Sequence, residues 1–212
     1  MVQLYSPHTT AGLAGAYDKR YYIPEVRIWP DGRIIWVEWE GHAREVLEGH
    51  LTEEEREALL ERIISVGFFE WEHNYYTLGG NSISPMYLLV NLADRSKEVR
   101  EHGGAPDAYY ELEEFLQSGA GAEGHDFLPT RGYVTLEKLN RGVGGAPWPS
   151  DTDLSPKEIG EGRYVEGEAL RFVWEQVNQH PTAPVYVEHD GTSYIAMVQV
   201  PGVSYFQPPP VE

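Results

Sequence analysis

The chain has 212 residues, 41% of them hydrophobic, which is enough to build a buried core in one large domain or two small ones. Asp and Glu outnumber Lys and Arg by 34 to 16, and the formal net charge of −18 argues against nucleic acid or an anionic membrane surface as a partner. The absence of cysteine excludes disulfides, thiolate nucleophiles and thiolate metal sites.

Residues 1–20 are small and polar and predict a loose N-terminal arm. The first regular element is a β-hairpin around Pro30-Asp31-Gly32, because proline presets φ and glycine accepts a positive φ in a tight turn. The strand after this turn has large apolar side chains on both faces, with Ile34 and Trp36 opposite Ile35, Val37 and Trp39. We therefore expect it to be central in a sheet that is covered on both faces, with another strand following over 44–51.

Two helices and a second hairpin are predicted next. Thr52 and Glu55 have the spacing of a capping box, and the apolar residues after them recur at helical spacing until Gly67. A hairpin over about 85–101 follows. The second helix is expected to have Pro106 at its first position and to end at Gly119.

The glycine- and alanine-rich segment 118–124 is the predicted boundary between two parts of the chain. An α+β domain of hairpins and helices spans 21–118, and a C-terminal α+β part over 126–207 packs on it. That part contains a strand at 132–137, a helical turn at 155–158, a helix at 167–179, and a hairpin at 184–200 with its turn at Asp190-Gly191. Residues 208–212 form a proline-rich tail, which we expect to be polyproline-like and unpacked.

These elements predict an α+β fold. Its sheet is expected to be twisted, mainly antiparallel and built from β-hairpins, with about three helices packed on it.

The region from about Pro24 to Gln117 resembles an uncharacterised bacterial domain family that is found mostly in exported proteins and lipoproteins. The matching features are Pro30-Asp31-Gly32, Leu51-Thr52, Gly67-Phe68-Phe69 and Gly104-Ala105-Pro106. They are structural rather than catalytic. The resemblance implies an extracytoplasmic location, periplasmic or at the cell surface, and a non-enzymatic role.

The sequence predicts no metal and no cofactor. None of the eight histidines has another at the second or fourth position along, although a site assembled from distant histidines stays open. Asp151, Asp153 and Ser155 imitate the start of a calcium loop, but Pro156 stands where that loop needs glycine. There is no phosphate-binding loop and no nucleophile elbow, so no catalytic residue is assigned.

The candidate binding surface consists of Trp71, His73, Tyr75 and Tyr76. They do not keep the alternation of a half-buried strand, and Gly79-Gly80-Asn81 follows them. Aromatic side chains on such segments are common in recognition surfaces. An edge strand whose aromatic rings cover the core is the competing interpretation.

We expect a non-catalytic, extracytoplasmic binding or protein-interaction protein. Its partner would be an unknown protein or a neutral or cationic ligand. The first 22 residues have no basic start with an apolar stretch after it, so no signal peptide is expected within this chain, and no apolar run is long enough to span a membrane. Two alternatives stay open: a carboxylate-based hydrolase, and a proteinaceous enzyme inhibitor or immunity-type protein.

Overall fold

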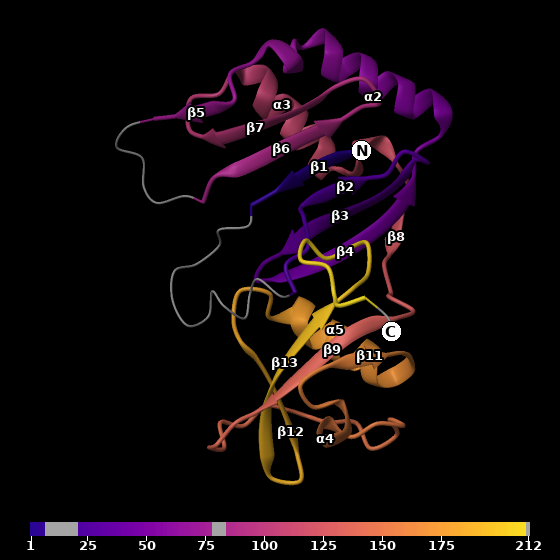
Figure 1. The fold of residues 1–212 in the computed structure, drawn as a ribbon, viewed down its shortest axis with the longest axis vertical. Coiled ribbons are helices and arrows are strands. Elements are labelled where there is room, and N and C mark those ends of the chain that lie inside the picture. The colour runs from indigo at the N-terminus through magenta and orange to yellow at the C-terminus, as the bar shows by residue number, and fades with distance from the viewer. Residues whose placement is uncertain (7–20, 78–83, 211–212) are drawn as a thin grey trace. The chain divides into compact units, whose positions relative to one another are not determined.

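The computed structural model describes residues 1–6, 21–77 and 84–210. The chain forms two compact units (Figure 1). Unit 1 comprises residues 1–9, 24–38 and 46–127, and unit 2 comprises residues 10–23, 39–45 and 128–212. Helices and strands occur together in both units, and most of the strand pairs are antiparallel, so the predicted α+β class is confirmed.

The strands of unit 1 belong to an eight-stranded sheet with the order β5-β7-β6-β1-β2-β3-β4-β8. Its elements in chain order are β1 (Val2–Tyr5), β2 (Val26–Ile28), β3 (Arg33–Glu40), β4 (Ala43–His50), α2 (Glu53–Ser65), η1 (Phe68–Glu70), β5 (Asn74–Tyr76), β6 (Met86–Asn91), β7 (Ser96–His102), α3 (Asp107–Gln117), η2 (Gly119–Gly121) and β8 (Gly124–Asp126).

The prediction of a loose N-terminal arm is wrong for residues 2–5. These residues form β1, which lies in the middle of the sheet and pairs antiparallel with both β2 and β6. All four side chains are buried. A four-residue strand is too short to show a period, and its long-range pairing partners are invisible in a local pattern. Residues 7–20, the rest of the predicted arm, lie outside the described residues.

The first hairpin forms as predicted. Gly32 has φ of 98°, and its N–H donates to the carbonyl of Trp29 at 3.1 Å. The next strand, β3, has Ile34 and Trp36 buried on one face and Ile35 and Val37 buried on the other. The expectation of a central strand covered on both faces is therefore confirmed for residues 34–37, whereas Trp39, which was expected on the same face as Ile35 and Val37, is 50% exposed.

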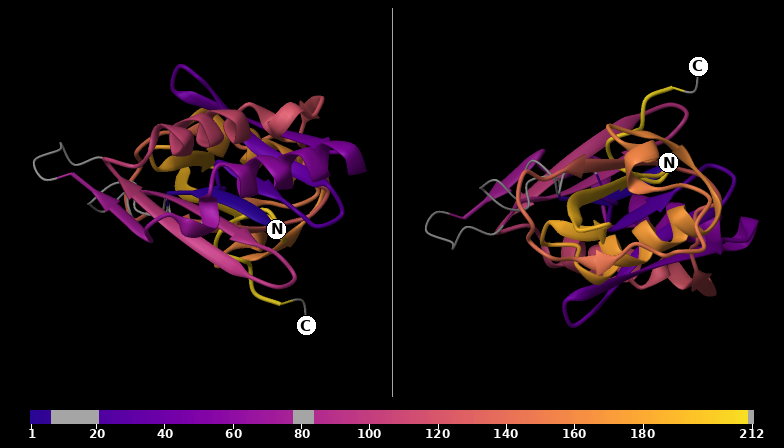
Figure 2. Two further views of the ribbon diagram at one scale, coloured as in Figure 1. Left: turned by 90° about the horizontal axis from the view of Figure 1, so that it is seen from above. Right: turned by 90° about the horizontal axis from the view of Figure 1, so that it is seen from below.

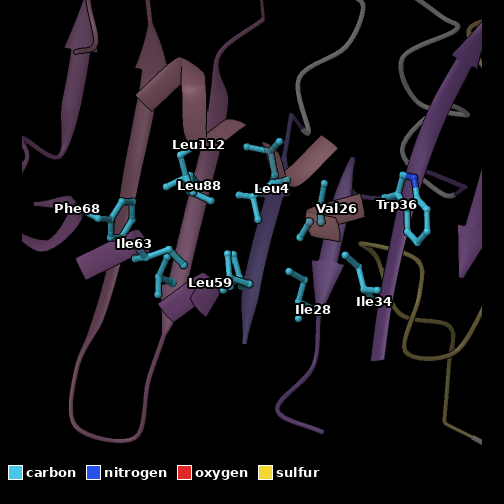
Figure 3. Close-up of a cluster of buried hydrophobic side chains, with 14 of the residues drawn as sticks. Leu4, Val26, Ile28, Ile34, Trp36, Leu59, Ile63, Phe68, Leu88 and Leu112 are labelled. Carbon is cyan, nitrogen blue, oxygen red and sulfur yellow. The ribbon is translucent and has the colours of Figure 1, made fainter. Parts of the chain in front are cut away.

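The core of unit 1 lies between the sheet and two helices. Leu59 and Ile63 of α2 and Leu112 of α3 meet the side chains of β1, β2, β3 and β6 in one buried cluster (Figure 3). Both helices cover the same face of the sheet (Figures 1 and 2). The two helices also contact each other: the guanidinium carbon of Arg62 in α2 lies 4.2 Å from the ring centroid of Phe115 in α3.

The helix ends follow their sequence signals. Thr52 and Glu55 form the predicted capping box, and Gly67 after α2 has φ of 75°. Pro106 is the N-cap of α3 rather than its first helical residue, since its ψ of 151° is extended. The second hairpin forms between β6 and β7, and the N–H of Leu92 donates to the carbonyl of Arg95 in its turn.

The predicted boundary at 118–124 is wrong. These residues belong to unit 1, which continues to Phe127. Two of their three glycines pack on the indole of Trp36: a Cβ at Gly124 would lie 2.3 Å from the ring, and one at Gly119 would lie 2.9 Å from it. The absence of a side chain at these glycines therefore allows close packing against a large ring. A glycine-rich sequence is typical both of such packing and of a flexible linker, so the sequence alone does not distinguish them.

Unit 2 contains a five-stranded sheet with the order β10-β12-β13-β9-β11, so the chain has two sheets where one was expected. Its elements are β9 (Gly132–Lys138), β10 (Ala146–Pro147), α4 (Pro156–Ile159), β11 (Arg163–Val165), α5 (Gly167–Gln179), β12 (Val185–His189) and β13 (Thr192–Gln199). The predicted helix at 167–179 is confirmed, as is the turn between β12 and β13, where Asp190 and Gly191 both have positive φ.

A buried polar network holds α5 in unit 2. Arg44 is 6% exposed, and its guanidinium donates to the side-chain oxygen of Asn178 and, at 3.1 Å, to the carbonyl of Tyr21. The amide of Asn178 donates in turn to the carbonyl of Trp174 at 2.8 Å. Burial of these groups is tolerated because each of them has a partner.

The proline-rich tail is more ordered than predicted at one point. The hydroxyl of Tyr164 donates to the carbonyl of Pro209 at 2.6 Å, and just before the tail the amide of Gln199 donates to the carbonyl of Phe206 at 2.9 Å. Proline lacks an N–H but keeps a carbonyl acceptor, so a proline-rich tail can still be held in place through its carbonyls.

Candidate functional site

The predicted aromatic segment starts from a firm anchor. Phe68 is completely buried, and its ring makes edge contacts with Phe69 and Trp71. The ammonium of Lys97 donates to the carbonyls of Phe69, at 2.9 Å, and of Trp71. These bonds fix the point where the segment leaves η1.

Trp71 and Tyr75 belong mainly to the core. Both are partly buried and pack against the hydrophobic cluster of unit 1. The Trp71 ring lies 6.0 Å from that of Tyr109, and the Tyr75 hydroxyl accepts the N–H of Glu72 at 3.0 Å. For these two residues the competing interpretation, an edge strand with rings that cover the core, describes the structure better.

Tyr76 and His73 are exposed. The Tyr76 side chain is 63% exposed, and its ring stacks on that of His102 with centroids 5.2 Å apart and an angle of 26° between the planes. The Nδ1 atom of His73 lies 3.2 Å from the carbonyl of Glu98, and its own carbonyl accepts the N–H of Arg100 at 2.9 Å. The structure thus divides the four predicted residues between the core and the surface.

The segment forms β5, the edge strand of the eight-stranded sheet, and pairs parallel with β7 (Figure 1). The ladder extends through His73 and Thr77. The carbonyl of His73 accepts the N–H of Arg100, and the N–H of Thr77 donates to the carbonyl of His102 in β7. Since peptide groups alternate in direction along a strand, those of Asn74 and Tyr76 point away from β7. No described strand pairs with that edge. Gly79-Gly80-Asn81 lies outside the described residues.

A groove of about 860 Å³ lies in unit 2, between β9, α4 and the β12–β13 turn. Its lining mixes polar and apolar groups and carries both signs of charge. Three carboxylates and three basic groups face it: Glu137, Glu161 and Asp190, and Lys138, Lys157 and His189. No local pattern in the sequence indicates this groove, because its walls come from three separate segments.

Unit 1 has a second hollow, of about 460 Å³, with a mainly apolar lining that includes Trp29, Leu59 and Leu92. In the part of the chain that the structure describes, no three His, Asp or Glu side chains come together as metal ligands. No helix among these residues has both the length and the apolar character needed to cross a bilayer.

No family model, curated protein or solved structure matches this chain.

Sequence reasoning missed His102, the partner of the most exposed tyrosine. The two residues are 26 positions apart and meet only because β5 pairs with β7 in the register that places Tyr76 beside His102. A parallel pairing between segments with other elements between them leaves no local signal, since such a connection has no fixed length or turn chemistry.

Proposed function

We propose that this chain is a non-catalytic, extracytoplasmic protein-interaction protein that receives an extended segment of another protein along the free edge of β5. One observation carries the proposal. A 63% exposed tyrosine, stacked on a histidine, lies on an edge strand whose outward peptide groups have no described strand beside them. The extracytoplasmic location in this proposal rests only on the motifs within residues 24–117 that resemble those of an exported family, since no family model matches the chain.

Strand addition suits this edge physically. An added strand would bond the peptide groups of Asn74 and Tyr76, and its side chains would alternate between the two faces of the sheet. On the outer face, the Tyr76–His102 stack offers a rigid aromatic platform with few torsions to immobilise.

The occupant is expected to be basic. The chain carries a net charge of −18, and on or beside β5 and β7 the four residues Glu70, Glu72, Glu98 and Glu101 stand against the three residues Arg95, Lys97 and Arg100. A second copy of the chain would bring like charges together at this edge, and this is unfavourable at close range.

Photo-crosslinking tests the proposal. Benzoylphenylalanine is placed at position 76 in cells that make the natural protein, with position 143 as a matched control, because Val143 is also an exposed apolar residue, in unit 2. We expect a discrete adduct with another protein from position 76 and none from position 143. Equal labelling from both positions, or none from position 76, would contradict the proposal.

A backbone variant separates strand addition from simple ring contact. Asn74→Pro removes an N–H that points away from β7, whereas Tyr75→Pro removes one that the β5–β7 ladder uses. We expect Asn74→Pro to lose the adduct and keep the melting temperature, and Tyr75→Pro to lower both. Full crosslinking by a stably folded Asn74→Pro variant would exclude main-chain recognition.

A carboxylate-based hydrolase is the second candidate function, and the groove in unit 2 is the observation that favours it, because Glu137, Glu161 and Asp190 line one cavity. The test uses a panel of 4-methylumbelliferyl glycosides. Under this alternative, at least one of Glu137→Gln, Glu161→Gln and Asp190→Asn lowers turnover about 100-fold. The control, Asp153→Asn, changes an exposed residue outside the lining and keeps turnover. Absence of wild-type hydrolysis across the panel would remove this candidate for glycosides.

A further inference from the structure

A second group of side chains lies on the opposite face of the same sheet edge, under α3. Glu101 is the neighbour of Tyr75 in the β5–β7 register and of Met86 in the β6–β7 register. Its Oε1 atom accepts the hydroxyl of Tyr110 at 2.9 Å and also the N–H of Gly103. Glu113, one helical turn after Tyr110 on α3, accepts the amide of Gln117 at 3.4 Å.

Tyr109 brings an unsatisfied donor to this group. Its side chain is completely buried, and its hydroxyl has no hydrogen-bond partner among the described residues. Tyr109 and Glu113 are four residues apart on α3, so their side chains lie on the same face of that helix. Burial raises the pKa of the Tyr109 hydroxyl, and the charges of Glu113 and Glu101 raise it further. A buried hydroxyl without an acceptor costs free energy. Such a group is expected where a ligand completes the site.

The carboxylates of this group have no cation to balance them among the described residues. No Lys, Arg or His side chain there lies within ion-pair distance of Glu101 or Glu113. Burial raises the pKa of Glu113 to about 7, and the charges of Glu101 and Glu25 add to the shift. Like charges held together in a partly buried place create a strong preference for a cationic ligand.

We propose that Glu101, Glu113 and the hydroxyls of Tyr109 and Tyr110 bind one basic side chain, an arginine guanidinium, of the segment that adds to β5. This inference rests on the proposed function. A strand added beside β5 lies two strand spacings, about 10 Å, from β7, and every second side chain points to the face under α3. A long basic side chain there passes over Tyr75 and reaches Glu101.

Guanidinium fits this site better than a metal ion or an ammonium. Its planar fork can donate to two carboxylates at once, and it stacks on aromatic rings such as that of Tyr75. A metal would need at least three ligands in close geometry, and none of the described residues form such a set. The same added strand would thus place one side chain on the Tyr76–His102 stack and the next one on the carboxylates.

The test uses a matched pair of small probes on the full chain. Nα-acetyl-arginine amide carries the guanidinium, and Nα-acetyl-citrulline amide is its neutral counterpart of nearly the same shape. We expect the arginine probe to shift the NMR signals of the Tyr109 and Tyr110 rings, with a dissociation constant on the order of 1 mM. The citrulline probe should leave them unchanged.

Variants assign the binding to these residues. Glu101→Gln and Glu113→Gln should weaken arginine binding about tenfold or more, whereas Glu114→Gln, an exposed neighbour on the same helix, should not change it. Tyr109→Phe separates binding from folding, because it removes the hydroxyl that lacks a partner. We expect weaker arginine binding with a melting temperature no lower than that of the wild type.

Proton release gives an independent readout. Glu25, Glu101, Tyr109, Tyr110 and Gln117 surround Glu113, and a bound cation should drive the proton off Glu113. Arginine binding is therefore expected to be tighter at pH 8 than at pH 6 in the wild type, and this difference should vanish in Glu113→Gln.

The outcomes distinguish the two proposals. Equal shifts with both probes, or Ca²⁺ producing the same shifts in place of arginine, would overturn the arginine site. If arginine fails to bind while position 76 still crosslinks, the proposed arginine site is rejected and strand addition to β5 is retained. Binding of arginine together with no crosslinking at position 76 would keep the cation site and remove the proposed function.

Discussion

Substitution of Glu113 should make the stability of this protein less dependent on pH. Burial raises the pKa of the folded carboxyl from its usual 4.5 to about 7. The unfolded chain therefore loses this proton at a lower pH than the folded chain does. The free energy of unfolding should fall as the pH rises from about 4.5 to about 7 and stay level above that range.

The magnitude follows from the size of the shift. A shift of one pKa unit corresponds to about 1.4 kcal/mol, so a rise from 4.5 to about 7 sets an upper limit of roughly 3 kcal/mol. Glu113 is partly exposed, and solvent screening reduces this to about 1–2 kcal/mol. For a chain of this size that corresponds to about 3–6 °C in melting temperature.

The assay is thermal unfolding between pH 4.5 and pH 8, followed by circular dichroism. Glu113→Gln should match the wild type at pH 4.5 and melt about 3–6 °C higher at pH 8. Glu114→Gln, exposed on the same helix, should follow the wild type at every pH. If the wild type and Glu113→Gln keep a constant difference across this range, Glu113 does not have a raised pKa and the reasoning fails.

Three further predictions concern the fold. Gly32→Val should lower the free energy of unfolding by about 2 kcal/mol or more in chemical denaturation, because φ is 98° and a Cβ would lie 2.4 Å from the Leu51 carbonyl. The control Gly142→Val has open space around it, and its free energy of unfolding should stay within about 0.5 kcal/mol of that of the wild type. Arg44→Met should lower the melting temperature by several degrees, since it leaves the buried side-chain oxygen of Asn178 without its donor; an unchanged melting temperature would contradict this. EDTA should leave the melting temperature unchanged, and a drop reversed by zinc or calcium would reveal a site that this reasoning missed.

Much of the local structure of this chain could be predicted because its signals are local. The capping box of Thr52 and Glu55, the positive φ of Gly32 and the turn at Asp190-Gly191 each depend on a few adjacent residues. The failures have the opposite character. The strand β1 depends on partners near residues 27 and 88, and the glycines at 119 and 124 depend on a tryptophan at 36.

The candidate surface was predicted in part. Loss of alternation at 71–76 correctly marked a change in local structure, because η1 and a bend precede a strand of only three residues. It could not show which rings turn inward. That is decided by the register with β7, which places Tyr75 beside Glu101 and Tyr76 beside His102. The carboxylate group under α3 had no sequence signal, since Glu101 and Glu113 belong to different elements.

The central position of β1 has a consequence for how the protein folds during synthesis. During synthesis the second edge of β1 stays unpaired until β6, which lies about 80 residues later in the chain, has been made. Until then its unpaired edge is open to other strands. Contacts between such distant segments slow folding and lengthen exposure to aggregation. The nascent chain is thus expected to need protection, by a chaperone or by slow translation, until β6 has emerged.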